Sequence, residues 1–254
     1  MKKGDIINII LAVLAIGLVF IMPINIKYKI LCCMVLCGGY ICFSISKLRY
    51  FANVICLVLI SFLEIEICNL NLLETISIIK FLLNIVILSI IFIELNLLFK
   101  SVWKCNVLYM FIMAVIGIAA YYVYEFRKIP LSVSNIFQIK TAGLVLKQYE
   151  FKVDWRVICV IGIFVCVCLF SYLNKENLQE RSKKKRLCSG VFAIIVGIII
   201  FFTPLNNIFN INTNSWDLQE VYHSNGLVLE CVQNEKKRGV EKPEGFSKKK
   251  YDAL

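Results

Sequence analysis

Seven apolar segments follow one another along the first 204 residues of the chain. Each is near the roughly 20 mostly apolar residues with which a helix crosses about 30 Å of hydrocarbon. Open strands would leave backbone groups unpaired in lipid, so every crossing segment is predicted to be a helix. The pattern predicts an all-α fold, a polytopic transmembrane helical bundle of seven spans. The predicted spans are residues 6–22, 29–46, 51–69, 75–99, 106–124, 155–173 and 188–204.

Two polar stretches interrupt or follow the apolar pattern. Residues 125–153 are too long for a turn and too polar to cross a membrane, so we interpret them as an interfacial segment. Residues 205–254 form a polar tail. The chain thus divides into a transmembrane domain, residues 1–204, and a juxtamembrane tail.

Composition argues against a soluble protein, and charge sets the orientation. Hydrophobic residues make up 59% of the chain and charged residues 18%, against about half and a quarter in soluble domains. The net charge of +11 does not indicate nucleic acid as a partner, because the basic residues sit in short loops between spans. The basic run at 181–186 predicts a cytoplasmic N-terminus, and seven spans then make the tail extracellular. Frequent Ile, Lys and Asn are typical of an AT-rich bacterial genome, so the expected location is a bacterial cell membrane.

The cysteines are interpreted as structural. Most of the twelve lie within apolar segments, where cysteine packs as a small hydrophobe. Cys33 and Cys37 share a helical face, but no His or carboxylate completes a metal site there. We therefore expect neither a metal nor another cofactor in this chain.

Three charged residues fall inside predicted spans, where charges are functional candidates. Glu64 and Glu66 lie near the outer end of the third span and Lys80 near that of the fourth, so their depths should match. We predict an ion pair between Lys80 and one of the two glutamates. The alternatives are that all three side chains extend to the interface, or that they serve ion or proton transport. No polar sequence continues inward to favour transport.

The segment 125–153 is predicted to contain a helix lying in the outer membrane interface. Pro130 stops the preceding helix, and Ser132, Ser134 and Asn135 offer N-cap residues for a helix over 136–149.

Cations in this segment form a basic ledge at the level of the lipid headgroups. Lys140 and Lys147 are a heptad apart and point the same way, with Arg127 and Lys128 nearby. Arginine suits bidentate contact with phosphate. The ledge either meets anionic headgroups in general or holds one lipid phosphate specifically.

Three short runs here resemble a known family. They are YEFRKIPL at 124–131, NIFQIKTA at 135–142 and KQYEF at 147–151. Lipoteichoic-acid-synthase-like phosphoglycerol transferases read as aromatic-Arg-Gly-x-Pro-Leu, then an Asp-led helix with Thr-Ala, then Tyr-x-Phe. This chain departs at Lys128, where glycine is usual, and at Asn135, where aspartate is usual. The candidate headgroup-binding residues are Arg127, Lys140, Lys147 and Tyr149.

The tail extends the resemblance. Its order of residues is similar to the juncture that the family uses between membrane and catalytic domains: Trp216, Tyr222, Asn225 and Gly226, then KPEGFS at 242–247. Taken alone, residues 216–223 predict a short helix capped by Asn214 or Ser215. The pair Asn225-Gly226 predicts a turn, and residues 227–232 fit either a strand or a helix.

The resemblance implies a chemistry that this chain does not carry. Complete members have an extracellular sulfatase-like α/β domain with a divalent metal, usually manganese, and a threonine nucleophile. They move glycerophosphate from phosphatidylglycerol to a polymer or glycan. The tail of 50 residues is too short for that domain, and its one histidine, His223, is interpreted as a solvated helix-end residue.

We therefore expect the membrane-anchoring half of a phosphoglycerol-transferase-like protein of cell-envelope synthesis, inactive alone. Its expected partners are membrane lipids, with phosphatidylglycerol as the candidate, and a catalytic domain in cis or in trans. The alternative is a stand-alone membrane protein, a permease or a sensor. Sparse polar residues disfavour a permease, and the lack of a recognisable soluble domain disfavours a sensor.

Overall fold

A computed structural model describes residues 49–69, 75–133, 153–176, 178, 182–209, 211 and 217–236, with the isolated positions 13, 17 and 26. Within this part the regular structure is helical, without strands. The predicted spans 6–22 and 29–46 lie outside the described ranges, as does the predicted interfacial helix at 136–149.

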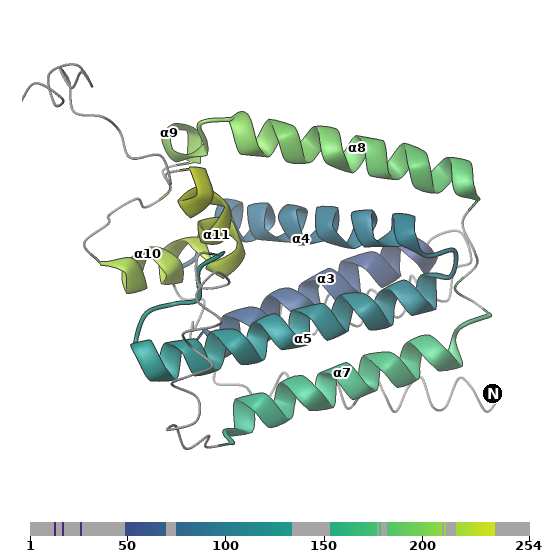
Figure 1. The fold of residues 1–254 in the computed structure, drawn as a ribbon, viewed down its shortest axis with the longest axis horizontal. Coiled ribbons are helices and arrows are strands. Elements are labelled where there is room, and N and C mark those ends of the chain that lie inside the picture. The colour runs from purple at the N-terminus through teal and green to yellow at the C-terminus, as the bar shows by residue number, and fades with distance from the viewer. Residues whose placement is uncertain are drawn as a thin grey trace, which may run out of the picture.

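Five long helices lie side by side in a bundle (Figure 1). All five are long and apolar enough to cross a membrane, which indicates a multi-pass membrane protein. They confirm five of the predicted spans to within a few residues. The helices are α3 (Arg49–Cys68), α4 (Ile78–Leu98), α5 (Val102–Arg127), α7 (Trp155–Leu173) and α8 (Lys183–Phe202).

Three short helices gather at one end of the bundle (Figure 1). They are α9 (Leu205–Phe209), α10 (Leu218–Asn225) and α11 (Leu227–Lys236). We call this the tail end. Because neighbouring helices alternate in direction, α3, α5 and α8 finish at the tail end, whereas α4 and α7 begin there (Figure 1). The end of α5 and the start of α7 therefore lie at the same end of the bundle.

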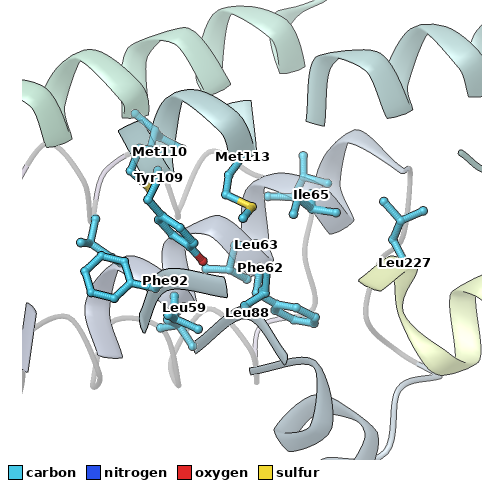
Figure 2. Close-up of a cluster of buried hydrophobic side chains, with 14 of the residues drawn as sticks. Leu59, Phe62, Leu63, Ile65, Leu88, Phe92, Tyr109, Met110, Met113 and Leu227 are labelled. Carbon is cyan, nitrogen blue, oxygen red and sulfur yellow. The ribbon is translucent and has the colours of Figure 1, made fainter. Parts of the chain in front are cut away.

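The helix α3 is the centre of the bundle. It contacts α4, α5 and α7, and 72% of its apolar stretch is buried inside the protein. For α8, which packs on α4, the buried share is only 17%. The main hydrophobic cluster joins α3 to α4 and α5, and Leu227 of α11 lies at its edge (Figure 2). Tyr109 of α5 meets Phe92 of α4 edge to face in this cluster.

Buried polar groups join α3 to its neighbours. Asn53 of α3 and Asn106 of α5 exchange two amide hydrogen bonds, at 3.1 and 3.0 Å. Asn106 also donates to the hydroxyl of Ser171 on α7, at 3.1 Å. Farther toward the tail end, the hydroxyls of Ser61 and Tyr109 are 2.7 Å apart. Polar contacts of this kind hold membrane helices together, since lipid offers no competing hydrogen bonds.

The contact between α8 and α4 is apolar and close. Gly190 of α8 faces Leu97 of α4, where an added Cβ would come within 2.6 Å of the leucine Cδ1. Small residues allow helices to approach in this way. At the other end of the bundle from the tail, the Arg186 guanidinium donates to the Phe99 carbonyl, at the C-terminus of α4.

Candidate functional site

The most connected polar site in the described structure lies where α10 and α11 meet the bundle. We call it the tail dock: Glu66 of α3, Asn84 of α4, and Asn225, Gly226 and Glu230 of the tail. Asn84, Glu66 and Asn225 are fully buried. Figure 1 shows α10 and α11 across the tail end of α4 and α5.

The junction between α10 and α11 is a sharp turn that only glycine accommodates. Asn225 ends α10, and Gly226 has a φ of 84°, a conformation that costs L side chains strain. A Cβ at Gly226 would also lie 2.7 Å from the Asn84 amide nitrogen. The predicted turn at Asn225-Gly226 is confirmed, and residues 227–232 are helical rather than extended.

Side chains from the membrane helices cap the N-terminus of α11. The backbone N–H of Leu227 donates to Glu66 Oε1 at 2.7 Å, and that of Leu229 donates to Asn84 Oδ1 at 2.8 Å. The first N–H groups of a helix have no partner within it, and a carboxylate there also interacts favourably with the helix dipole. A residue just before the helix usually supplies the cap. Here α3 and α4 supply it.

Asn84 also binds the end of α10. Its Nδ2 donates to the carbonyls of Lys80 and Asn225, both at 2.8 Å. The Asn225 amide in turn donates to Glu230 Oε2 at 2.8 Å. One buried amide on α4 thus contacts both tail helices, and directional bonds fix their position more narrowly than apolar packing would.

Apolar contacts seal the tail dock. Tyr222 and Leu227 belong to the main hydrophobic cluster. Leu229 packs with Ile87 of α4 in a second cluster. Asn234 donates to the Tyr222 hydroxyl at 2.7 Å, and burial raises the pKa of that phenol. Tyr222, predicted to lie at the membrane–tail juncture, is therefore part of the core.

The start of the tail differs from the sequence prediction. α10 begins at Leu218, and its N-cap is Asp217, whose side chain accepts the Glu220 N–H at 3.0 Å. Asn214, Ser215 and Trp216, predicted as caps and first residue, lie outside the described ranges. Asp217 competes as a cap because aspartate three residues before a glutamate suits a helix start.

His223 is partly buried, so its prediction as a solvated residue was wrong. Its carbonyl accepts a hydrogen bond from the Thr75 hydroxyl at 2.8 Å, between the tail and the start of α4. Burial lowers the pKa of the imidazole, against a hydrogen bond with the Asn69 backbone and the charge of Asp217.

The three charged residues singled out in the spans have separate surroundings. Glu66 caps α11. Lys80 is buried on α4, and its carbonyl accepts a hydrogen bond from the Asn84 amide. Glu64 is 1% exposed, and neither of its carboxyl oxygens has a hydrogen-bond partner in the described part of the chain. Among the described residues the structure records no ion pair of Lys80 with Glu64 or Glu66.

Of the predicted basic ledge, the structure describes only the start. Arg127 is the last residue of α5 and is exposed. Lys128 follows it in a left-handed conformation, with φ 55°, and pairs with Glu125 at 3.0 Å. The carbonyl of Leu131 accepts the Cys231 thiol of α11 at 3.7 Å. Lys140, Lys147 and Tyr149 lie outside the described ranges.

No three His, Cys, Asp or Glu side chains come together as a metal site within the residues that the structure describes. The manganese of complete members belongs, by the resemblance, to their catalytic domain and not to the part that this chain resembles. We assign no chemical step to this chain.

Sequence reasoning missed Asn84 and Glu230, two members of the tail dock. Asn84 stands alone in an apolar run, which is a usable signal, because a buried amide needs partners. Its partners are 141 and 145 residues away along the chain, and no local pattern identifies them.

Compared with known proteins, the chain matches no family model, no curated sequence and no solved structure at a significant level.

Proposed function

We propose that this chain is the membrane-anchoring and lipid-presenting half of a phosphoglycerol-transferase-like protein of cell-envelope polymer synthesis, without catalytic activity of its own. The single observation that supports the proposal most is the tail dock. A membrane anchor must hold the segment that leaves the bundle in a fixed position. The hydrogen bonds from α11 to Glu66 and Asn84 hold the tail in this way.

The proposed lipid site adjoins this anchor. Arg127 lies four residues before Leu131, whose carbonyl bonds to α11. The exit of α5 and the tail are therefore parts of one surface at the tail end. A phosphate held by Arg127, with Lys140 and Lys147 as further candidate ligands, would lie on this surface, close to α11. Phosphatidylglycerol is the lipid that the family resemblance favours.

The proposed orientation places the tail end outside a bacterial cell. Exposed lysines at the opposite end support it, since cytoplasmic loops carry an excess of Lys and Arg. These are Lys100, Lys104, Lys175, Lys183, Lys184 and Lys185. A tag after residue 254 should be accessible to protease on intact cells, and a tag before residue 1 should not. The reverse result would contradict the orientation.

Lipid binding tests the functional part of the proposal. The full chain is reconstituted in nanodiscs with phosphatidylglycerol or phosphatidylcholine, and bound lipid is measured by native mass spectrometry. We expect Arg127→Ala to lower phosphatidylglycerol retention about tenfold, the loss of one good charge-assisted contact. Lys175→Ala, an exposed cation at the opposite end, is the matched control. Equal retention in both variants would exclude the headgroup role of Arg127.

One observation favours the alternative, a permease. Asn53, Asn106 and Ser171 are buried between three helices, where a transporter would place polar groups. Their side chains bond to one another, however, which fits a structural role better. Solute uptake by liposomes that depends on Asn106 would reverse this preference.

A further inference from the structure

Glu64 is an acid enclosed between helices. It is 1% exposed and stands on α3, the helix at the centre of the bundle. Both carboxyl oxygens are buried and without a hydrogen-bond partner in the described part of the chain. Native proteins pair nearly all buried polar groups, so an unpartnered carboxyl needs a reason.

The surroundings of Glu64 keep out water. α5 passes close to α3 at Gly117, where an added Cβ would lie 3.8 Å from the Glu64 carbonyl and 3.5 Å from the Cys68 sulfur. One helical turn before Glu64, the hydroxyls of Ser61 on α3 and Tyr109 on α5 form a hydrogen bond of 2.7 Å. Figure 2 shows Tyr109 and Met113 of α5 near Leu63 and Ile65 of α3, which are the sequence neighbours of Glu64.

The titratable groups of neighbouring elements offer no positive partner. The nearby titratable groups on α3 and α5 are the Cys68 thiol, one turn along the helix, and the Tyr109 hydroxyl, which bonds to Ser61; neither is a cation. On α7, Arg156 is paired with Asp154 at 2.6 Å. Among the described residues, no cation is placed to balance an ionised Glu64.

Glu66 provides the contrast, two residues along the same helix. It too is fully buried, but it accepts the Leu227 N–H at 2.7 Å. A carboxylate that accepts backbone N–H groups at a helix N-terminus is stabilised in its charged form. Glu64 has no such donor, and an isolated carboxylate in a low-dielectric interior is very costly.

We propose that Glu64 is a membrane-embedded proton-binding site: its carboxyl group holds a proton in the packed bundle and exchanges it only when α3 and α5 separate. A proton is the ligand that fits, because it neutralises the acid and needs no cavity. On release the O–H bond breaks, the proton passes to a water molecule, and a carboxylate remains. α5 contacts α3 on both sides of Glu64 along the helix, near Cys68 at Gly117 and through the Ser61–Tyr109 pair, so in this proposal water reaches the carboxyl group only when these contacts part.

Infrared spectroscopy of the full chain in liposomes tests the proton. At about pH 7, where a solvated glutamate is ionised, we expect the carbonyl-stretch band of a protonated carboxyl. Glu64→Gln should remove it, and Glu66→Gln, the matched control, should leave it. Absence of the band in the wild type, or its survival in Glu64→Gln, would overturn the proposal.

Two further experiments test whether helix separation controls proton exchange and whether Glu64 is unpaired in the folded protein. Gly117→Leu should push α5 from α3 and speed the shift of the band in D₂O at least tenfold, whereas Gly197→Leu on α8 should not. An unchanged exchange rate in Gly117→Leu would refute gating by helix separation.

Glu64→Met should match or exceed the wild type in thermal stability, since it replaces an unpartnered acid by an apolar side chain of similar length. A lower stability would mean that Glu64 has an ionic partner.

Discussion

The helices α3 and α8 have equal length and nearly equal hydropathy but opposite roles. Each has 20 residues, and their apolar stretches are almost equally hydrophobic. α3 is largely buried among α4, α5 and α7, whereas α8 packs on α4 and presents most of its surface outward. What distinguishes α3 is the spread of its polar contacts along the helix: Asn53, Ser61 and Glu66 each bond to another element. The contact of α8 with Phe99, made by Arg186, lies in its first turn.

The comparison teaches that hydropathy identifies a membrane helix but does not place it. A helix in lipid gains little from burying one more leucine against protein, because lipid tails are equally apolar. A buried amide or hydroxyl gains a partner only in the interior. Polar side chains therefore select the central helix, and three substitutions test this, from the strongest expected effect to the weakest.

The largest loss is expected from Asn106→Leu. It removes the partner of Asn53 and of Ser171 together and leaves both groups buried, at about 1–3 kcal/mol for each unsatisfied group. We expect the free energy of unfolding in mixed detergent micelles to fall by about 3 kcal/mol. A loss no larger than that of a lipid-facing variant would show that polar contacts do not hold α3.

An intermediate effect is expected from Glu66→Ala, which removes the cap on Leu227. A buried N–H then loses a charged acceptor, at about 2 kcal/mol. The loss should concentrate on the tail, so hydrogen exchange should rise in residues 227–232 and remain unchanged in α7. Glu66→Gln is the control, since its side-chain oxygen can still accept the bond. Uniform exchange changes would disprove local docking.

The smallest effect is expected at the contact of α8 with α4. Gly190→Ala would bring a Cβ against the Leu97 side chain, which can rotate away, so the loss should stay near 1 kcal/mol. Ile198→Ala on the exposed face of the same helix should change stability by less than about 0.5 kcal/mol. If Gly190→Ala exceeded Asn106→Leu, the ranking of centre over periphery would be reversed.

The sequence predicted the parts of the structure that depend on local pattern. The five described spans were located because their apolar runs are long. The turn at Asn225-Gly226 was located because this pair stops helices. Residues 227–232 stayed ambiguous, since six apolar and polar positions fit a strand or a helix, and the caps that decide for a helix come from α3 and α4. The ion pair with Lys80 was predicted from depth alone, and a depth argument does not reveal that Glu66 accepts a backbone N–H from a segment 161 residues away.

The cap on α11 also bears on how the protein is made. Glu66 and the Leu227 N–H that it accepts are 161 residues apart, so ribosomal synthesis delivers α3 and α4 long before α11 exists. Until then Glu66 and Asn84 lack the hydrogen bonds that they make to the backbone N–H groups of α11. Closure of the tail dock is therefore a late step of biogenesis, and it can occur only on a bundle whose third and fourth helices have already inserted in register. Docking of the tail therefore requires correctly assembled membrane helices. In an incompletely inserted chain, α10 and α11 would remain undocked and accessible to cellular proteases.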